Sequence, residues 1–266
     1  MNVNKSLTIV ILTKNESKNL SNCVSFIPKK YRCIVLDSVS DDDTVFLAKK
    51  LGCDTFINGW NGFAAQRNFA LNNCRIISEW VLFVDVDEIY PIEFFVWFEK
   101  HIHTLDCFDV LMVPSCLFFN RQQLKFAPGY PILHPRLVRS NISPFTNGQF
   151  GHNEEIIDFF RIGFTKISYH HYFFDGDYKC WMHKHLLLAL EESKLNRITG
   201  TKKTFRTKIN LLFRFSLLRP FLRFFYHFFI RLGFLDGLNG LRYSLMYLWF
   251  ELTKYFLITA RLNEKS

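Results

Sequence analysis

The feature that most constrains this chain is an apolar run that ends in three carboxylates, Trp-Val-Leu-Phe-Val-Asp-Val-Asp-Glu over residues 80–88. Its aromatic and β-branched residues predict a buried strand. Carboxylates crowded at the tip of a strand repel one another and favour a bound cation. Because side chains alternate along a strand, Asp85 and Asp87 point to the same side, where their oxygens suit a hard divalent ion. A solvated strand end is the other interpretation of Asp-x-Asp alone, so the surrounding pattern has to decide.

Four β-rich segments alternate with helical patterns in the first half of the chain. Strands are expected at residues 7–12, 33–36, 53–57 and 80–84. Helices are expected at residues 20–27, 45–51, 63–71 and 91–101, the second with a capping-box start at Ser40 and Asp43. This order predicts an α/β fold whose sheet is mostly parallel, with helices on both faces.

Polar side chains follow three of these strands, at residues 13–16, 37–40 and 85–88. In an open α/β sheet, ligands bind beyond the carboxyl ends of the strands, so the three segments are expected to converge on one site. The sequence contains neither Gly-x-Gly-x-x-Gly nor a Walker lysine, which counts against a dinucleotide site or a P-loop.

Basic charge is concentrated near the C-terminus. Residues 197–242 contain ten Lys and Arg against one acid, Asp236, and the resulting +9 equals the net charge of the whole chain. A basic stripe recurs at every fourth position: Arg219, Arg223, His227 and Arg231. Phe and Leu fill most positions between, and Pro220 is expected to separate two helices. The pattern is typical of helices that lie in the interface of an anionic bilayer.

Two alternatives to membrane binding exist for this basic region. It could form two core helices with a solvated basic edge, or bind nucleic acid, although no nucleic-acid motif accompanies the charge. The chain has no run of about 18 uncharged apolar residues. Its seven cysteines form no Cys-x-x-Cys pair. A cytoplasmic protein, peripheral on the inner face of the cytoplasmic membrane and binding no nucleic acid, is therefore expected.

The acidic tip and the two earlier polar strand ends, in this order and spacing, resemble the family 2 glycosyltransferases of GT-A fold. The segments that begin at Trp60, His170 and Gly233 resemble, more narrowly, the bacterial lipopolysaccharide-core β-1,4-glucosyltransferases. The resemblance implies a GT-A domain with a C-terminal amphipathic helical extension. Residues 1–114 would form its nucleotide-sugar-binding half, residues 115–199 its acceptor-binding half, and residues 200–266 a basic membrane-associating segment.

The resemblance implies an inverting transfer of a sugar, expected to be glucose, from a UDP-sugar to a lipid-linked saccharide such as the lipopolysaccharide inner core. A capsule, O-antigen or polyprenyl-phosphate acceptor is an alternative, as is a non-catalytic membrane-surface scaffold of the same fold. The expected partners are thus a UDP-sugar donor, a lipid-linked acceptor and an anionic membrane surface.

The same resemblance assigns roles to individual residues. Mg²⁺ or Mn²⁺ is the implied cofactor, with Asp85, Asp87 and His171 as its ligands. The residues implied in binding the nucleotide-sugar are Thr13, Asn15, Glu16, Asp37, Arg67 and Asp85. Glu154 is implied as the general base that removes the acceptor proton, and Glu155 is its rival. Asp236 is expected to turn the chain between helices.

Overall fold

The computed structural model describes residues 6–128, 131–147, 154–194 and 216–263. The chain divides into two compact units that interleave along the sequence. Unit 1 comprises residues 1–116, 131–147 and 154–172, and unit 2 comprises residues 117–130, 148–153 and 173–266. The predicted three-part division at residues 114 and 199 stays a prediction, and the second of these boundaries lies outside the described residues.

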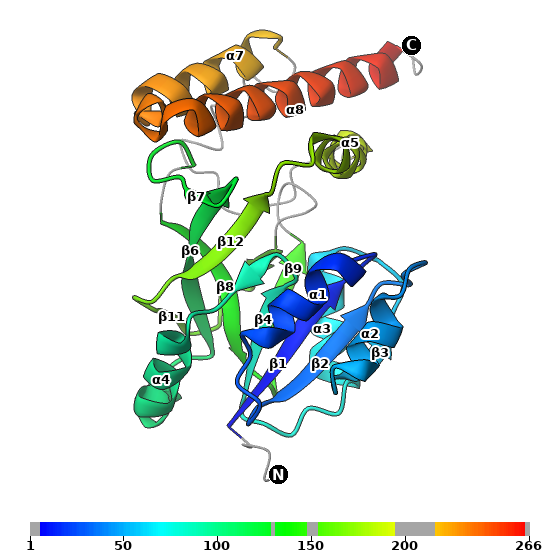
Figure 1. The fold of residues 1–266 in the computed structure, drawn as a ribbon, viewed down its shortest axis with the longest axis vertical. Helices are drawn as coiled ribbons and strands as arrows, with labels where there is room; N and C mark the ends of the chain where they lie inside the picture. Colours follow the sequence, from blue (N-terminus) through cyan, green and yellow to red (C-terminus); the bar gives the residue numbers. More distant parts are fainter. Residues whose placement is uncertain (1–5, 129–130, 148–153, 195–215, 264–266) are drawn as a thin grey trace. The chain divides into compact units, whose positions relative to one another are not determined.

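The central sheet of ten strands has the order β3-β2-β1-β4-β8-β6-β12-β5, and β7 and β11 pair with β6 (Figure 1). Its first four strands are parallel and match the predicted segments: β1 (Leu7–Thr13), β2 (Arg32–Asp37), β3 (Asp54–Ile57) and β4 (Trp80–Asp85). The others are β5 (Glu88–Ile89), β6 (Val110–Phe119), β7 (Gln122–Gln123), β8 (Ile132–Arg139), β11 (Ile162–Phe164) and β12 (Tyr169–Phe174). A separate hairpin joins β9 (Phe145–Asn147) to β10 (Glu154–Ile156).

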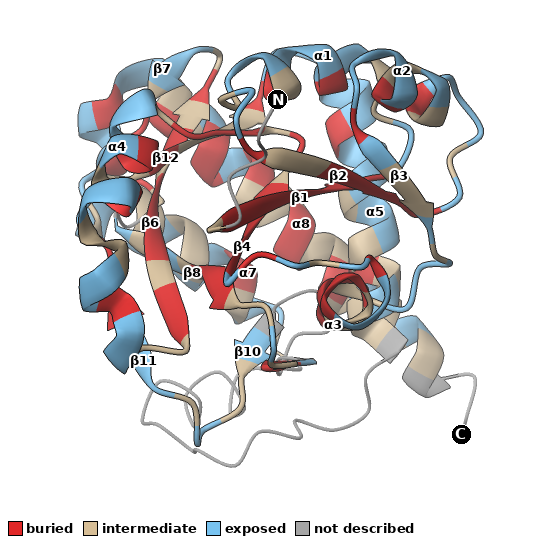
Figure 2. Cartoon of the chain, turned by 90° about the horizontal axis from the view of Figure 1, so that it is seen from below, coloured by how far each residue is buried: buried red, intermediate tan, exposed pale blue. Residues whose placement is uncertain are grey.

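Alternation along the parallel strands explains how helices cover both faces of the sheet, as predicted. On one face, Ile9 and Val35 pack with α1 (Ser17–Ser25), α2 (Thr44–Lys50) and α4 (Ile92–His101). On the other face, Val10 and Ile34 pack with α3 (Phe63–Asn73). The strands at the centre are buried on both sides (Figure 2). Continuous apolar runs, rather than alternating ones, follow from this double coverage.

Beyond β4 most strand pairs are antiparallel, although β11 pairs parallel with β6. β8 pairs antiparallel with both β4 and β6, and β5 pairs antiparallel with β12. A 3₁₀ helix (Ile102–Cys107) leads from α4 into β6. The turn from β4 into β5 thereby places the acidic tip against β12, because His171 of β12 is in register with Glu88 of β5.

Unit 2 is largely helical. It contains α5 (Tyr178–Lys194), α7 (Leu218–Phe225), a π-helical turn η2 (Tyr226–Ile230), a 3₁₀ turn η3 (Gly233–Asp236) and α8 (Gly237–Asn263). Pro220, which was expected to separate two helices, lies in the first turn of α7, and the helical path continues through η2. A proline is tolerated there since the first turn needs no intrahelical N–H donor. The first of the two expected helices lies outside the described residues, so the separation stays a prediction. Among the helices in the described ranges, none combines the length and apolar character needed to cross a bilayer.

Candidate active site at the carboxyl ends of three strands

The predicted convergence of the polar strand ends is confirmed by the register of the sheet. Thr13 at the end of β1 lies opposite Asp37 at the end of β2. On the other side of β1, Leu12 lies opposite Asp85 at the end of β4. Three neighbouring strands therefore deliver an alcohol and two carboxylates to one edge of unit 1.

Asp37 is fully buried and its carboxylate is held by three donors. The Thr13 hydroxyl donates to Oδ2 at 3.0 Å, and the Ser40 hydroxyl donates to the same oxygen at 2.5 Å. The backbone N–H of Ser40 donates to Oδ1 at 2.8 Å. Three donors fix the direction of the carboxylate. Asp37 and Thr13, both predicted to bind the nucleotide, thus act as one unit.

The loops after β1 and β2 are tied to each other by Asn15 and Glu16. The Asn15 N–H donates to the Ser40 hydroxyl at 2.8 Å, and the Asn15 side-chain oxygen accepts from the N–H of Asp41 at 2.8 Å. The Glu16 N–H donates to the Thr44 hydroxyl at 2.9 Å. Both predicted residues therefore shape the loop that carries Asp37.

Two residues of these loops adopt positive φ, Asn15 at 56° and Val39 at 63°. Asparagine tolerates this region, but a β-branched valine in it is strained. The Val39 side chain is also exposed. Strained backbone of this kind clusters at ligand-binding sites, where the surrounding hydrogen bonds sustain it.

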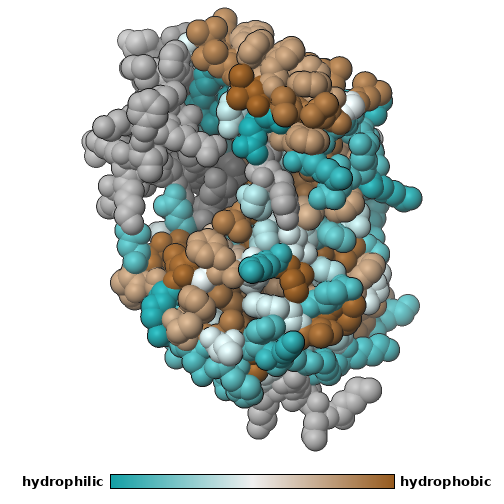
Figure 3. All heavy atoms as spheres, turned by 90° about the vertical axis from the view of Figure 1, so that its left-hand side faces the viewer, coloured by the Kyte–Doolittle hydropathy of each residue, from teal (hydrophilic) through white to brown (hydrophobic). Residues whose placement is uncertain are grey.

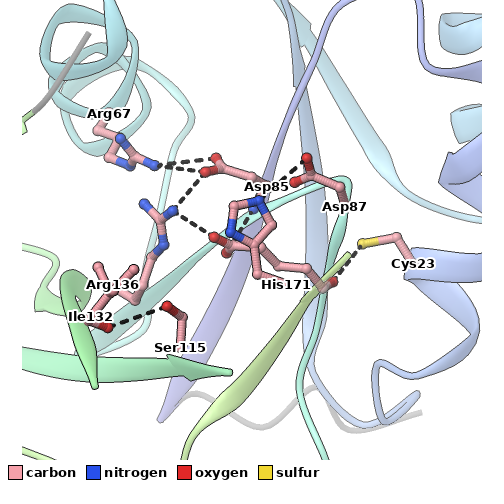
Figure 4. A network of polar contacts seen from close by, with 9 residues as sticks. Cys23, Arg67, Asp85, Asp87, Ser115, Ile132, Arg136 and His171 are labelled. Carbon is pink, nitrogen blue, oxygen red and sulfur yellow. Dashed lines mark hydrogen bonds and ion pairs between the residues drawn. The ribbon is translucent and has the colours of Figure 1, made fainter. Parts of the chain in front are cut away.

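At the end of β4, Asp85 forms ion pairs with two guanidinium groups (Figure 4). Arg67 Nη2 lies 3.1 Å from Oδ1 of Asp85, and Arg136 Nη2 lies 2.6 Å from Oδ2. Arg136 Nη2 also lies 2.6 Å from Oε1 of Glu88. The Asp85 N–H donates to the other Glu88 oxygen at 3.1 Å. Two arginines and two carboxylates therefore form one network.

The Arg67 side chain is fully buried on α3. Its guanidinium carbon lies 5.5 Å, 5.7 Å and 5.8 Å from the ring centres of Phe63, Phe83 and Phe145, respectively. Aromatic faces attract a cation and exclude water from it. Arg67 was predicted to serve the phosphates or the base, and the structure shows that its charge is directed at Asp85.

Arg136 was missed by the sequence analysis. It lies in β8, in an irregular part of the chain, and only the antiparallel pairing of β8 with β4 brings it to the acidic tip. An arginine at the start of the strand-like run Arg-Leu-Val-Arg, residues 136–139, is the signal that could have marked it, because a buried cation requires a nearby anion.

Asp87 is paired with His171, as the sequence analysis predicted for the metal ligands. Oδ2 of Asp87 lies 3.5 Å from Nε2 of His171, and the Tyr172 N–H donates to the Asp87 carbonyl at 2.8 Å. Burial lowers the pKa of His171, but the carboxylates of Asp87, Glu88 and Asp85 outweigh it and raise the pKa above 6.5. The imidazole therefore lies in a field that favours positive charge.

Glu88 is the most deeply buried acid of the tip. Burial raises its pKa to about 7, although the Arg136 guanidinium opposes this shift. Burial and the neighbouring guanidinium therefore act in opposite directions on the Glu88 carboxyl group.

The three predicted metal ligands do not form one group in the structure, because Asp85 has different partners from Asp87 and His171. No group of three or more His, Cys, Asp or Glu side chains arranged to hold a metal ion is found in the part of the chain that the structure describes. Both oxygens of Asp85 face arginines, whereas Asp87 and His171 face each other and are each about one quarter exposed. The chemistry of this pair, one carboxylate oxygen and one imidazole nitrogen, fits a divalent ion whose shell is completed by phosphate oxygens.

The predicted general base, Glu154, and its rival, Glu155, belong to the β9–β10 hairpin. Glu154 is in register with Asn147, and Glu155 with Thr146. Glu155 is exposed, and the side chain of Glu154 lies outside the described residues. Asn68 anchors the hairpin to α3, donating to the Phe145 carbonyl at 2.8 Å and accepting from its N–H at 3.3 Å. The catalytic role of either glutamate stays a prediction.

Both the sequence and the fold are similar to those of known proteins. The model of a family described as glycosyl transferase family 2 matches residues 8–222. A Rickettsia conorii protein described as an uncharacterized glycosyltransferase is 41% identical over 91 residues, 32% of this chain and 32% of that protein. The prophage-derived glycosyltransferase SunS of Bacillus subtilis is 33% identical over 114 residues, 41% of this chain and 26% of SunS. The chain spans about a third or less of the length of these curated relatives.

Two solved structures are also similar. Staphylococcus aureus TarS 1–349 in complex with UDP-GlcNAc aligns over 97% of this chain and 92% of its own, with 16% identity and a TM-score of 0.47. Glucosyl-3-phosphoglycerate synthase from Mycobacterium tuberculosis, in complex with Mn²⁺, UDP and glucosyl-3-phosphoglycerate, aligns over 63% of this chain and 72% of its own, with 16% identity and a TM-score of 0.45.

The family match begins at the second residue of β1 and extends into α7, so it includes every strand described above. The mixed sheet with helices on both faces is the GT-A fold that the sequence resemblance implied. The chain belongs to glycosyl transferase family 2.

Proposed function

We propose that this protein is an inverting, metal-dependent glycosyltransferase that moves a sugar, glucose in the simplest case, from a UDP-sugar to a lipid-linked saccharide such as the lipopolysaccharide inner core. The observation that carries the proposal is the register of β2, β1 and β4, which aligns the buried Asp37 with the acidic tip at one edge of the sheet. A nucleoside diphosphate needs two neighbouring sites, one that binds the base and one that offsets the negative charge of the diphosphate.

In this proposal Asp37 receives a hydrogen bond from the N–H of the base. The carboxylate is suited to this because Thr13 and Ser40 fix its orientation before the donor arrives. A carboxylate held in advance costs little ordering entropy on binding, so its hydrogen bond contributes more of its strength to affinity.

Asp87 and His171 would hold a divalent ion, and the diphosphate of the donor would complete its shell. Bound there, Mg²⁺ or Mn²⁺ supplies Lewis-acid stabilisation of the charge that gathers on the leaving diphosphate. Asp85 and Glu88 take a different part, because Arg136 and Arg67 already offset their charges. The arginines hold the β4–β5 turn rigid and thereby position Asp87.

The acceptor hydroxyl must lose a proton when it attacks the anomeric carbon, and Glu154 is our choice of base, with Glu155 the alternative. The two are separable because neighbouring residues on a strand point to opposite faces. Glu154→Gln and Glu155→Gln are compared for kcat of sugar transfer. The residue whose substitution lowers kcat while leaving donor affinity unchanged is the base, and two unchanged rates would exclude both.

The decisive experiment is calorimetric titration of the full chain with a panel of nucleotide-sugars, with and without Mn²⁺, alongside Asp87→Asn. We expect one UDP-sugar to bind in a metal-dependent manner and this dependence to be lost in the variant. Glu93→Gln, an exposed acid on α4, is the matched control and should bind like the unaltered chain. Absence of binding by every donor would instead favour a scaffold that keeps the fold without turnover.

The acceptor is tested separately, by supplying the bound donor with lipopolysaccharide core, capsule or O-antigen precursors, and polyprenyl phosphate. Transfer to the inner core alone is the expected result. Transfer to another of these acceptors would show that the protein is a glycosyltransferase and that its acceptor is not the inner core.

A further inference from the structure

The helical segment from α7 through η2 is turned so that its polar stripe faces the protein. Arg219, Arg223 and His227 follow one another at every fourth position, and none of them is exposed. His227 Nδ1 lies 2.8 Å from the Ala127 carbonyl. The sequence pattern suggested that this basic stripe would face lipid headgroups, and the structure instead directs these three side chains into unit 2.

A buried carboxylate on α8 explains the orientation of the stripe. Glu251 is almost fully buried, and Arg223 Nη1 lies 2.9 Å from its Oε1. Arg219 Nε lies 3.4 Å from the other oxygen, Oε2. Lys254, one turn further along α8, lies 2.9 Å from Oε1 as well. A buried carboxylate requires nearby cations, so Glu251 fixes which face of α7 packs on α8.

The opposite face of the same segment is apolar and exposed. It recurs in adjacent pairs every four residues, and each member has 43–65% of its surface accessible. The pairs are Leu217 and Leu218, Phe221 and Leu222, Phe225 and Tyr226, and Phe229 and Ile230. A soluble helix normally buries its apolar face and exposes its polar one, and this segment does the reverse.

The exposed apolar surface continues past the end of η2. Leu232, Phe234, Leu235 and Leu238 are each 43–60% exposed. Gly233 permits the tight turn between them, since a Cβ there would lie 2.6 Å from the His227 carbonyl oxygen. Figure 3 shows hydrophobic side chains gathered over these helices. We call the exposed apolar residues of 217–238 the apolar face. A patch of this extent marks an interaction site.

Charge identifies the kind of partner. The single acid between residues 216 and 242 is Asp236, which is buried and accepts backbone N–H groups of Lys125, Phe126 and Ala127. Arg242 is exposed and Arg231 is partly exposed at the margin of the apolar face. Within residues 216–242, exposed apolar side chains are thus accompanied by cations and by no exposed carboxylate, a composition that complements an anionic lipid surface.

We propose that the apolar face inserts into the interface of an anionic bilayer, with Arg231 and Arg242 at the headgroup level. The inserted groups are therefore phenylalanines and leucines, while Arg219 and Arg223 serve to orient the helix by pairing with Glu251. The inference deepens the proposed function, because it would bring the enzyme to a lipid-linked acceptor. It does not depend on sugar transfer for its test.

The test is flotation of the full chain with vesicles of phosphatidylglycerol and phosphatidylethanolamine, without nucleotide-sugar. Phe225→Gln/Phe229→Gln removes two exposed rings and should weaken vesicle partition by about tenfold or more. The matched control is Phe46→Gln/Phe159→Gln, which removes two exposed rings of unit 1 and should float like the unaltered chain. Circular dichroism confirms that each variant keeps its helices.

Other outcomes would overturn the proposal. One is an unaltered chain that does not float, and another is equal partition of the two double variants. A third is self-association in analytical ultracentrifugation that disappears in Phe225→Gln/Phe229→Gln while no flotation occurs, since this would identify a second copy as the occupant. The role of charge is checked with Arg231→Gln/Arg242→Gln, which should lower partition into anionic vesicles about tenfold and leave partition into phosphatidylcholine vesicles unchanged.

Discussion

Arg136 of β8 and Glu88 of β5 form an ion pair of 2.6 Å in which neither side chain is more than 4% exposed. The same Arg136 nitrogen lies 2.6 Å from Asp85. One guanidinium therefore joins the end of β4 to the start of β5, and the turn that carries Asp87 lies between these two anchors. Removing the guanidinium would leave the buried Glu88 carboxylate without this cation, while Arg67 would still pair with Asp85.

Arg136→Met should destabilise the chain by about 3 kcal/mol, because breaking a buried pair leaves an uncompensated charge. The free energy of unfolding is measured by urea denaturation at pH 7. Arg161→Met is the control, since Arg161 is largely exposed in its pair with Asp109 and should change stability little. The double variant Arg136→Met/Glu88→Met should recover most of the loss. A double variant as unstable as Arg136→Met would show that the unpaired Glu88 charge is not the cause of the loss.

Asp37→Asn should weaken UDP binding about 10- to 100-fold, the range expected for loss of a hydrogen bond to a charged group. Asparagine keeps the shape of the side chain but replaces one acceptor of three donors with a donor, so circular dichroism is used to check that the variant keeps the fold. Calorimetric titration with UDP measures the dissociation constant, and Glu93→Gln again provides the exposed control. An unchanged dissociation constant for Asp37→Asn would show that the nucleobase of UDP does not bind at Asp37.

Glu251 should make stability depend on pH in the acid range. Burial raises its pKa, but Lys254, Arg223 and Arg219 outweigh burial and hold the pKa below 4.5. A carboxyl group with a lowered pKa stabilises the fold above its unfolded value, and that contribution is lost as pH falls through the folded pKa. Thermal unfolding between pH 7 and pH 3 should therefore show a steeper loss for the unaltered chain than for Glu251→Gln. Parallel curves would show that Glu251 is not the titrating group.

Asp236→Asn should loosen the loop at residues 125–127. The two Asp236 oxygens accept three backbone N–H groups at 2.8–3.0 Å, and an amide replaces one of these acceptors with a donor. An unsatisfied buried donor costs about 1–3 kcal/mol. Hydrogen exchange of the amides of Lys125, Phe126 and Ala127 should accelerate, whereas Asp175→Asn, at an exposed acid of the same unit, should leave their rates unchanged.

Local pattern was sufficient to predict the parallel half of the fold. Continuous apolar runs such as residues 80–84 can be buried only as central strands, and polar residues at their carboxyl ends must then meet at one edge. Thr13, Asp37 and Asp85 were predicted on this basis, and β-strand register confirms their proximity. Asp87 and His171, which resemblance to a family implied as ligands of one metal ion, lie 3.5 Å apart in the structure, and their role toward a metal stays a prediction.

Arg136 could not be found in this way, because its partners lie about 50 residues earlier and the antiparallel strand that carries it follows an irregular stretch. Asp85 was predicted to be a metal ligand because the sequence did not reveal that two arginines lie beside it. Its arginine partners come from α3 and β8, and no spacing in the sequence relates either element to the tip of β4.

The spacing of Arg219, Arg223, His227 and Arg231 among Phe and Leu predicted a helix with a basic stripe, since side-chain periodicity is local. Which side of that helix faces the protein was not predictable, because tertiary contacts choose it. That choice depends on the buried charge of Glu251, 28 residues beyond Arg223, which must be paired to be tolerated. The arginines consequently turn inward, and the phenylalanines and leucines are left on the surface.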